Sequence, residues 1–154
     1  MKKTILILSF IVTAFASCKK DDKTDNGAQA AKDEAAIQAY LTANPSIKAT
    51  KDANGVYYQI ITEGTGKGVT SSSIISVNYV GKLLNGTQFD SRTGYAADMQ
   101  GGIIQGWKFG LTHASAGTRI LLIIPSALGY GTSATGSIPA NSVLVFTIDV
   151  LSVQ

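Results

Sequence analysis

Five aromatic side chains and one carboxylate fall in short segments spread along the second half of the chain. Residues 86–107 read GTQFDSRTGYAADMQGGIIQGW, and GYG follows at 129–131 and IPANSVLVF at 138–146. The residues concerned are Tyr79, Phe89, Asp90, Trp107, Tyr130 and Phe146. Because aromatic side chains bury large apolar areas, their convergence would form an apolar pocket with the Asp90 carboxylate at its edge. Such a pocket binds an apolar ring and needs neither a nucleophile nor a metal ion.

The chain offers little for other kinds of catalysis. It contains one histidine, His113, and one cysteine, Cys18, so a metal site built from clustered His and Cys ligands is not expected. The hydrolase motifs G-x-S-x-G and H-E-x-x-H do not occur in the sequence. An apolar binding pocket is therefore the chemistry that these residues favour.

The elements that must position the pocket are mostly strands. Alternating apolar residues and turn signals predict strands over residues 56–62, 73–84, 87–90, 119–124 and 143–150. Asn85-Gly86 predicts the hairpin turn between the second and third of them. One short helix is predicted over residues 105–111. Together these elements predict an α+β fold in which an antiparallel sheet of about five strands wraps around one short α-helix.

Five motifs occur in a fixed order in this half of the chain. They read VNYVG, NGTQFDS, IIQGW, IPSALGYG and SIPANSVLVF. In this order and spacing the chain resembles the FKBP-type peptidyl-prolyl cis-trans isomerases, over residues 55–154. The resemblance implies the FKBP-like fold and an enzyme that accelerates rotation about the peptide bond before proline. It implies no cofactor and no metal.

The resemblance also assigns roles to residues. Trp107 matches the pocket floor, and the walls match Tyr79, Phe89 and Phe146. The hydroxyl of Tyr130 would hold the carbonyl of the rotating bond, and Asp90 would polarise the bound amide. Three isoleucines complete the expected site: Ile103, Ile104, whose N–H would bond a substrate carbonyl, and Ile138, a flap residue that would close over the ligand.

One segment departs from the family's pattern. Between Phe89 and Trp107 the family commonly has a strand of the type P-x-x-F-x-L, whereas this chain has TGYAADMQGG at 93–102. The segment contains neither proline nor phenylalanine. Tyr95 or Met99 would have to take the place of the missing aromatic residue, and one wall of the pocket depends on which of them does so.

The first 17 residues have the composition of an export signal peptide. Lys2 and Lys3 precede an apolar run over residues 5–16, which is shorter than the ~20 residues of a membrane-spanning helix. The run leads into Phe15-Ala16-Ser17-Cys18, which resembles a bacterial lipobox. This resemblance implies a lipoprotein whose mature chain begins at a diacylated Cys18. An ordinary secretory signal or a buried strand is the alternative.

Residues 18–54 are predicted to form a lipid-anchored tether. KKDDKTDNG at 19–27 has no apolar residue, which indicates disorder. Residues 28–42 are alanine-rich, and they predict a short helix that Asn44-Pro45 ends and that serves as a docking arm or a spacer. As a flexible coil, residues 18–50 would hold the domain ~30 Å from the membrane. The folded domain is expected to span residues 55–154 and to begin near Val56.

The charge of the chain argues against nucleic acid as a partner. Lysine and arginine number 13 against 10 acidic residues, and without Lys2 and Lys3 the net charge of +3 falls to +1. Phosphate binding requires clustered basic side chains. Within residues 55–154 the basic residues are scattered over Lys67, Lys82, Arg92, Lys108 and Arg119.

The family resemblance therefore predicts a prolyl isomerase of the cell envelope. Its partners would be proline-containing polypeptides that are unfolded or newly exported, with macrolide inhibitors as potential ligands. The domain would contact a membrane only through its lipid anchor, on the outer membrane facing the periplasm or on the cell surface. Two alternatives remain: a non-catalytic proline-binding or chaperone module, which the altered segment 93–102 favours, and a structural envelope protein with a vestigial pocket.

Overall fold

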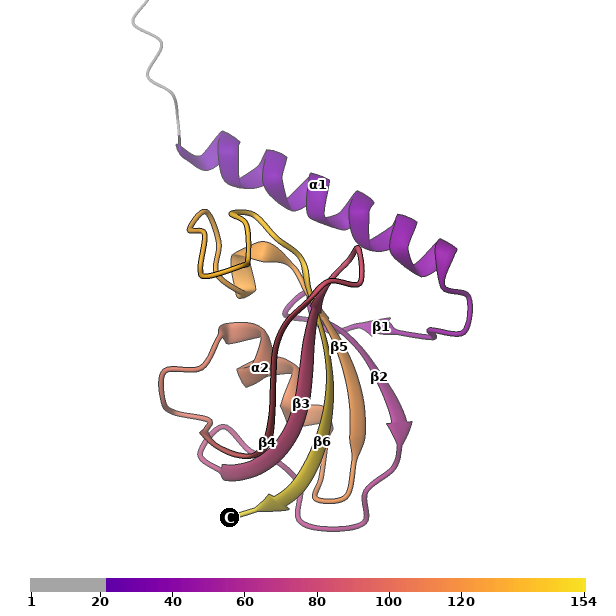
Figure 1. The fold of residues 1–154 in the computed structure, drawn as a ribbon, viewed down its shortest axis with the longest axis vertical. Coiled ribbons are helices and arrows are strands. Elements are labelled where there is room, and N and C mark those ends of the chain that lie inside the picture. Colours follow the sequence, from indigo (N-terminus) through magenta and orange to yellow (C-terminus); the bar gives the residue numbers. More distant parts are fainter. Residues whose placement is uncertain (1–21) are drawn as a thin grey trace, which may run out of the picture.

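An antiparallel sheet of six strands forms the body of the protein and curves around the short helix α2 (Figure 1). The computed structural model describes residues 22–154, with side chains from Gly27 onward. The strand order is β1-β2-β5-β6-β3-β4, and all neighbouring pairs are antiparallel. The elements are α1 (Asp22–Ala43), β1 (Thr50–Lys51), β2 (Tyr57–Thr62), β3 (Ile74–Leu83), β4 (Gln88–Asp98), α2 (Gln105–Gly110), η1 (Leu111–His113), β5 (Arg119–Ile124), η2 (Ser126–Leu128) and β6 (Leu144–Val153). The predicted α+β fold is confirmed.

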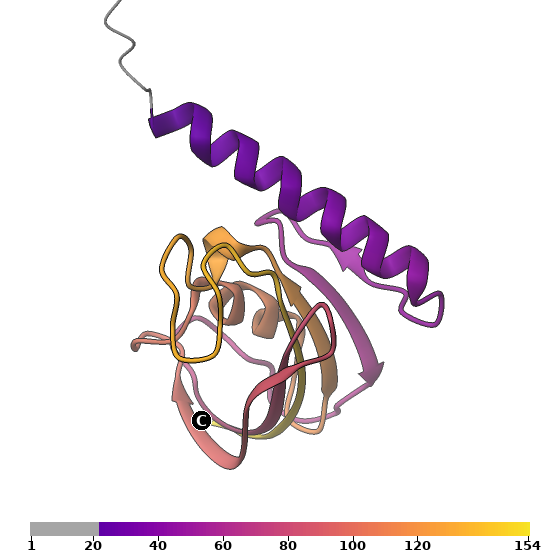
Figure 2. The ribbon, with the colours of Figure 1, turned by 45° about the horizontal axis from the view of Figure 1, so that its top comes forward.

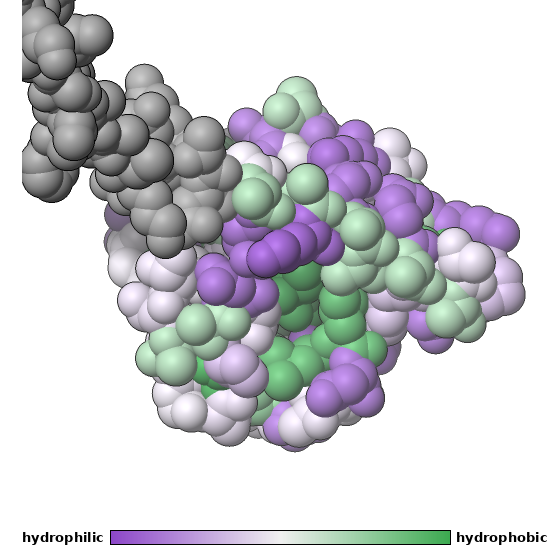
Figure 3. All heavy atoms as spheres, turned by 90° about the horizontal axis from the view of Figure 1, so that it is seen from above, coloured by the Kyte–Doolittle hydropathy of each residue, from purple (hydrophilic) through white to green (hydrophobic). Residues whose placement is uncertain are grey.

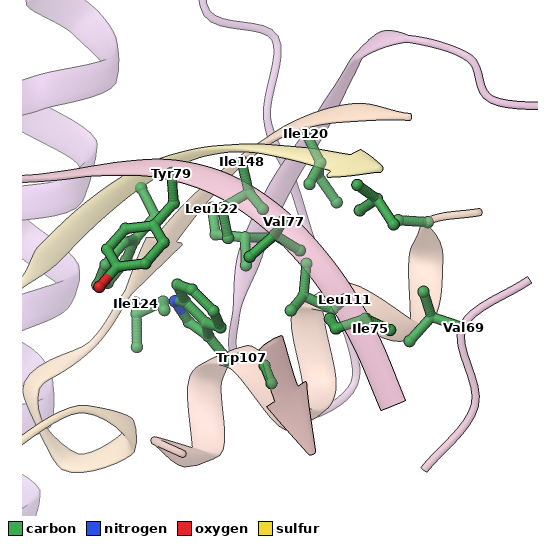
Figure 4. Close-up of a cluster of buried hydrophobic side chains, with 14 of the residues drawn as sticks. Val69, Ile75, Val77, Tyr79, Trp107, Leu111, Ile120, Leu122, Ile124 and Ile148 are labelled. Atoms are coloured by element: carbon green, nitrogen blue, oxygen red, sulfur yellow. The ribbon is translucent and has the colours of Figure 1, made fainter. Parts of the chain in front are cut away.

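Strand β5 shows how the sheet is buried on both faces. Its sequence RILLII has no polar residue after Arg119, as is typical of a strand covered on both sides. Ile120, Leu122 and Ile124 belong to the main core, whereas Leu121 and Ile123 belong to a second cluster on the opposite face. Figure 4 shows the main core, in which Trp107 and Leu111 point from α2 and η1 toward the sheet.

Helix α1 covers the second face of the sheet. It runs across the upper end of the molecule, from the loops that follow η2 to β1 (Figure 1 and Figure 2). Ile37 on this helix is fully buried in the second cluster, whose other buried members come from the sheet and from the residue before β6. They are Tyr57, Leu121, Ile123, Val143 and Val145. The predicted helical segment is therefore a docking arm and not a spacer.

The N-terminal boundary of the fold lies earlier than predicted. Helix α1 begins at Asp22, so the disorder predicted over residues 19–27 is wrong for residues 22–27. Strand β1 pairs with β2 through Thr50 and Lys51, so the folded unit also begins before Val56. The predicted signal peptide and Cys18 lie outside the described residues. Within residues 22–154, no helix combines the length and the apolar character that crossing a membrane requires.

Strand β4 is much longer than the predicted segment 87–90. It pairs with β3 as far as Asp98, with register shifts beside Tyr79 and beside Lys82. The side-chain Oδ1 of Asn78 accepts a 2.8 Å hydrogen bond from the N–H of Gly94, where the backbone has a φ of 62°. Because β4 lies at the sheet edge and is mostly exposed, its sequence lacks the alternation that would reveal a strand.

Candidate functional site

Eight of the nine residues predicted for the pocket line one cavity of about 220 Å³. We call this cavity the aromatic pocket. Hydrophobic residues line a hollow with hydrophilic residues at its edge on the face seen in Figure 3. The pocket is smaller than the ~300–1,000 Å³ typical of sites for drug-sized ligands, which suits a single ring. The eight residues are Tyr79, Phe89, Asp90, Ile103, Ile104, Trp107, Tyr130 and Phe146.

The indole of Trp107 joins the aromatic residues of the pocket. Its ring centroid lies 5.0 Å from that of Tyr79 and 5.3 Å from that of Phe146, with both pairs close to perpendicular. Phe89 meets Phe146 in the same edge-to-face manner at 5.5 Å, an arrangement that adds to the stabilisation from burial. Among the described side chains, Nε1 of Trp107 is the only buried nitrogen or oxygen without a hydrogen-bond partner. The indole therefore supplies apolar ring surface, and its N–H is a donor without a partner among the described residues.

A glycine in β3 makes room for two of the aromatic rings. Gly81 pairs with Asp90 on β4 and with Phe146 on β6. A Cβ added at this position would lie 2.6 Å from the ring of Phe89 and 2.8 Å from the ring of Phe146. Real Cβ atoms do not approach other atoms so closely, so the rings occupy the space that a side chain would fill.

Ile138 is the predicted pocket residue that does not line the cavity. It is buried in the main core with 6% of its surface exposed. Its backbone N–H and C=O bond to Thr135, which closes a tight turn. Its side chain belongs to the same core cluster as the pocket residues Trp107 and Phe146, and its role as a flap residue that closes over a ligand stays a prediction.

Three lining residues were not among those predicted for the site. They are Arg92, Tyr95 and Gly102. Tyr95 reaches the pocket because β4 continues past Asp90, and its ring packs edge-on against Tyr79 at 5.7 Å. Of the two residues considered for the missing aromatic wall, Tyr95 lines the pocket, whereas Met99 is buried in the core.

Tyr79 and Asp90 form the polar rim of the pocket. The Tyr79 hydroxyl donates a 2.6 Å hydrogen bond to Oδ2 of Asp90. Burial, and then the hydrogen bond to Asp90, raise the pKa of Tyr79 well above its usual value. The hydrogen bond from the protonated phenol keeps the carboxylate in a fixed position.

Tyr130 provides a second hydroxyl at the pocket. It follows η2, and 38% of its surface is exposed. Burial raises the pKa of its hydroxyl, and the charges of Asp90 and Tyr95 add to that shift. Tyr130 therefore remains a hydrogen-bond donor across the neutral pH range.

Ile104 offers a backbone donor. It is the residue before α2, with φ −62° and ψ 148°, and its carbonyl accepts hydrogen bonds from the N–H groups of Trp107 and Lys108. Within residues 22–154 no hydrogen bond occupies the N–H of Ile104 itself. This N–H is therefore free to bond a ligand in the pocket that Ile104 lines.

Comparison with known proteins identifies the family and the fold. Residues 66–151 match the model of the family described as FKBP-type peptidyl-prolyl cis-trans isomerase. The FKBP-type isomerase FkpA of Aeromonas hydrophila is 36% identical over 121 residues, which cover 76% of this chain and 45% of that protein. The peptidyl-prolyl cis-trans isomerase Mip of Coxiella burnetii is 36% identical over 122 residues, which cover 76% of this chain and 53% of that protein.

A solved structure agrees with these sequence matches. The crystal structure of FkpA from Escherichia coli superposes with a TM-score of 0.71 at 31% identity, covering 86% of this chain and 64% of that one. The chain spans about half the length of the curated relatives that it matches. The matching segment holds every pocket residue described above, and the chain belongs to the FKBP-type peptidyl-prolyl cis-trans isomerase family.

Proposed function

We propose that this chain is a peptidyl-prolyl cis-trans isomerase that binds proline in the aromatic pocket. The observation that carries the proposal is a set of aromatic walls around Trp107 with the Tyr79–Asp90 pair at the rim. Family membership supports the type of reaction. The substrates would be proline-containing segments of unfolded or newly exported polypeptides.

The energy that such a site must supply is modest. Rotation about a peptide bond costs ~18–20 kcal/mol because the C–N bond has partial double-bond character. Without a catalyst an X-Pro bond isomerises in roughly tens to hundreds of seconds. Each ~1.4 kcal/mol removed from the barrier gives a tenfold rate, so an acceleration of ~10⁴ needs about 5–6 kcal/mol. Several weak contacts can share this amount.

The apolar walls contribute by favouring the twisted amide. A planar amide is stabilised by charge separation between oxygen and nitrogen, and water favours that charge separation. The twisted amide has lost it, so a dry pocket binds the transition state better than the ground state. Trp107 and Phe146, residues that are 4% and 3% exposed, supply such a surface with their rings.

Three polar groups would orient the substrate. The Tyr130 hydroxyl would bond the carbonyl of the rotating bond, and the N–H of Ile104 would bond a neighbouring substrate carbonyl. Asp90, held by Tyr79, would polarise the bound amide from the rim. Fixing the flanking chain in this way restricts it to geometries that permit rotation.

The altered segment 93–102, which favoured a non-catalytic binding module, does not remove a wall of the pocket. The sequence of segment 93–102 puts one wall of the pocket in doubt, because it lacks the family's proline and phenylalanine. Residues 93–98 belong instead to β4, and Tyr95 lines the cavity. We therefore propose no second function, and the assay described next distinguishes an isomerase from a binding module.

The test compares catalysis with binding in the same variants. The full chain in mild detergent is assayed for the cis-to-trans rate of short Leu-Pro and Phe-Pro peptides, and for peptide affinity with a macrolide inhibitor as competitor. Asp90→Ala and Tyr130→Phe should each lower kcat/KM several-fold through lost transition-state contacts. No acceleration by the wild-type chain, with the peptide still bound, would leave a proline-binding module.

We also propose that the protein is a lipoprotein anchored through Cys18 in the cell envelope, on the outer membrane. The lipobox-like sequence before Cys18 supports this proposal. Because α1 begins at Asp22, the chain from Cys18 to Asp22 would span at most ~14 Å. The docked helix thus replaces most of the flexible tether. Metabolic labelling with a fatty acid should modify the wild-type chain and not Cys18→Ser, and protease accessibility on intact cells would report the face of the membrane.

A further inference from the structure

A buried carboxylate on α1 reaches the segment that carries Tyr130. Asp33 is 3% exposed, and its Oδ2 accepts hydrogen bonds from the backbone N–H of Ser126 at 2.8 Å and from its hydroxyl at 2.7 Å. Oδ1 accepts a third hydrogen bond from Nε2 of Gln29 at 2.7 Å. Ser126 is itself 1% exposed. The contact joins residues 93 positions apart in the chain.

Ser126 in turn holds the residues on both sides of Tyr130. Its carbonyl accepts hydrogen bonds from the N–H of Gly129 at 3.0 Å and from the N–H of Gly131 at 2.8 Å. Gly131 has a φ of 59°, a left-handed conformation that glycine adopts readily. The position of Ser126 therefore fixes the backbone from which the Tyr130 side chain extends into the pocket.

The start of η2 has no cap from its own sequence. The residue before Ser126 is Pro125, which makes no side-chain capping bond. The first N–H of a helical turn needs an acceptor, and Asp33 supplies it from another element. A carboxylate accepting two donors at one oxygen forms charge-assisted hydrogen bonds, which are stronger than neutral ones.

A second set of contacts, made by Glu34 next to Asp33, holds helix α1 against β1 and β2. Glu34 accepts a 2.5 Å hydrogen bond from the Tyr57 hydroxyl and a 2.8 Å bond from Nζ of Lys51. Ile37 is fully buried on the same helix. These contacts fix α1 on the sheet, so Asp33 holds Ser126 from a docked helix. In Figure 2, α1 lies above the loops that follow η2.

We propose that Asp33 is a positioning residue for Tyr130, acting through Ser126 and the Gly129–Gly131 turn. The inference rests on the proposed isomerase function, because it concerns the orientation of a hydroxyl in that site. Asp33 lies outside residues 66–151, which match the family model. The N-terminal helix is thereby part of the support of the site and not only a connection to an anchor.

A double-mutant cycle in the full chain tests this proposal. Asp33→Asn keeps the shape of the side chain but removes its charge, and it should lower kcat/KM about two- to threefold, which is no more than the loss in Tyr130→Phe itself. In the Tyr130→Phe background the same substitution should change kcat/KM by less than about twofold, because the group that it positions is absent. An equal loss in both backgrounds would overturn the proposal.

Glu34→Gln is the matched control, because it removes a neighbouring carboxylate on the same helix and leaves the Asp33–Ser126 hydrogen bonds and the burial of Ile37 in place. Amide hydrogen exchange should be faster at Gly129 and Gly131 in Asp33→Asn, and near the wild-type rate in Glu34→Gln. Identical exchange and identical kcat/KM in the two variants would overturn the proposal, since a loosened helix would then explain both.

A second variant covers the case in which Asp33→Asn fails to fold. Ser126→Ala removes the hydroxyl donor and leaves the backbone N–H bonded to Asp33, so it should accelerate exchange at Gly129 and Gly131 to a smaller extent. Unchanged exchange at these amides would contradict the proposal. Should the wild-type chain show no isomerase activity, the proposed function fails, whereas the exchange measurement still decides whether Asp33 orders this segment.

Discussion

The hydroxyl of Tyr79 donates a 2.6 Å hydrogen bond to Oδ2 of Asp90, which joins two pocket residues on the neighbouring strands β3 and β4. The ring of Tyr79 at the same time packs edge-on against Trp107. One residue therefore serves both the apolar wall and the polar rim.

Tyr79→Phe separates these two roles. The variant keeps the ring but leaves Asp90 without its donor, so kcat/KM should fall by roughly three- to tenfold. Tyr58→Phe, whose ring stacks on His113 away from the pocket, is the control and should retain the wild-type value. Peptide isomerisation rates for both variants check this. Equal activity of Tyr79→Phe and Tyr58→Phe would show that the rim hydrogen bond does not matter.

Gly81→Ala should disturb the pocket through its walls. The added methyl group would displace the rings of Phe89 and Phe146, at a cost of about 1–3 kcal/mol for an overpacked core, and should weaken peptide binding. Gly68→Ala is the control, because a Cβ there meets no atom within 4 Å. Calorimetry of unfolding and peptide titration measure the two effects. A Gly81→Ala chain with wild-type affinity would contradict the described geometry.

Glu34 should make the docking of α1 depend on pH. The hydrogen bond from Lys51, followed by that from Tyr57, lowers the pKa of Glu34 from 4.5 to about 2. A lowered pKa in the folded state means that the stabilisation is complete above pH 4.5 and is lost as the pH falls toward 2. Because the side chain is 39% exposed, solvent screening reduces the effect.

The measurement is urea unfolding of the wild-type chain and of Glu34→Gln between about pH 7 and about pH 2.5. The difference in unfolding free energy between them should be largest at neutral pH and should shrink below pH 4.5. A difference that stays constant over this range would contradict the assigned role of Glu34.

The strands with clear patterns could be predicted from the sequence. Strand β5 occupies the predicted residues 119–124, and β3 lies within the predicted 73–84. Strand β4 could not be predicted to its full length, because its exposed position and its register shifts remove the alternation on which such a prediction rests. The sequence alone therefore does not decide between Tyr95 and Met99 for the missing wall.

Only the pocket residues that lie within the five sequence motifs could be predicted. Residues within the motifs, such as Phe89 and Trp107, line the cavity. Ile138 also lies within a motif, but it is buried beside the turn with Thr135 and does not line the cavity. The role of Asp33 could not be predicted from the sequence, because its hydrogen-bond partner Ser126 lies 93 residues away in the chain. Local pattern carries no information on such a contact.

The isomerisation rate of a Leu-Pro peptide, measured with the wild-type chain, Phe146→Ala and Ile148→Ala, tests the central claim most directly. Both side chains are buried on β6, but only Phe146 lines the aromatic pocket. Each substitution should destabilise the fold by about 2–5 kcal/mol, and circular dichroism would verify that both variants are folded. Acceleration by the wild-type chain and Ile148→Ala, with loss in Phe146→Ala, is the predicted result. Equal activity of the two variants, or no acceleration by the wild-type chain, would contradict a prolyl isomerase acting in this pocket.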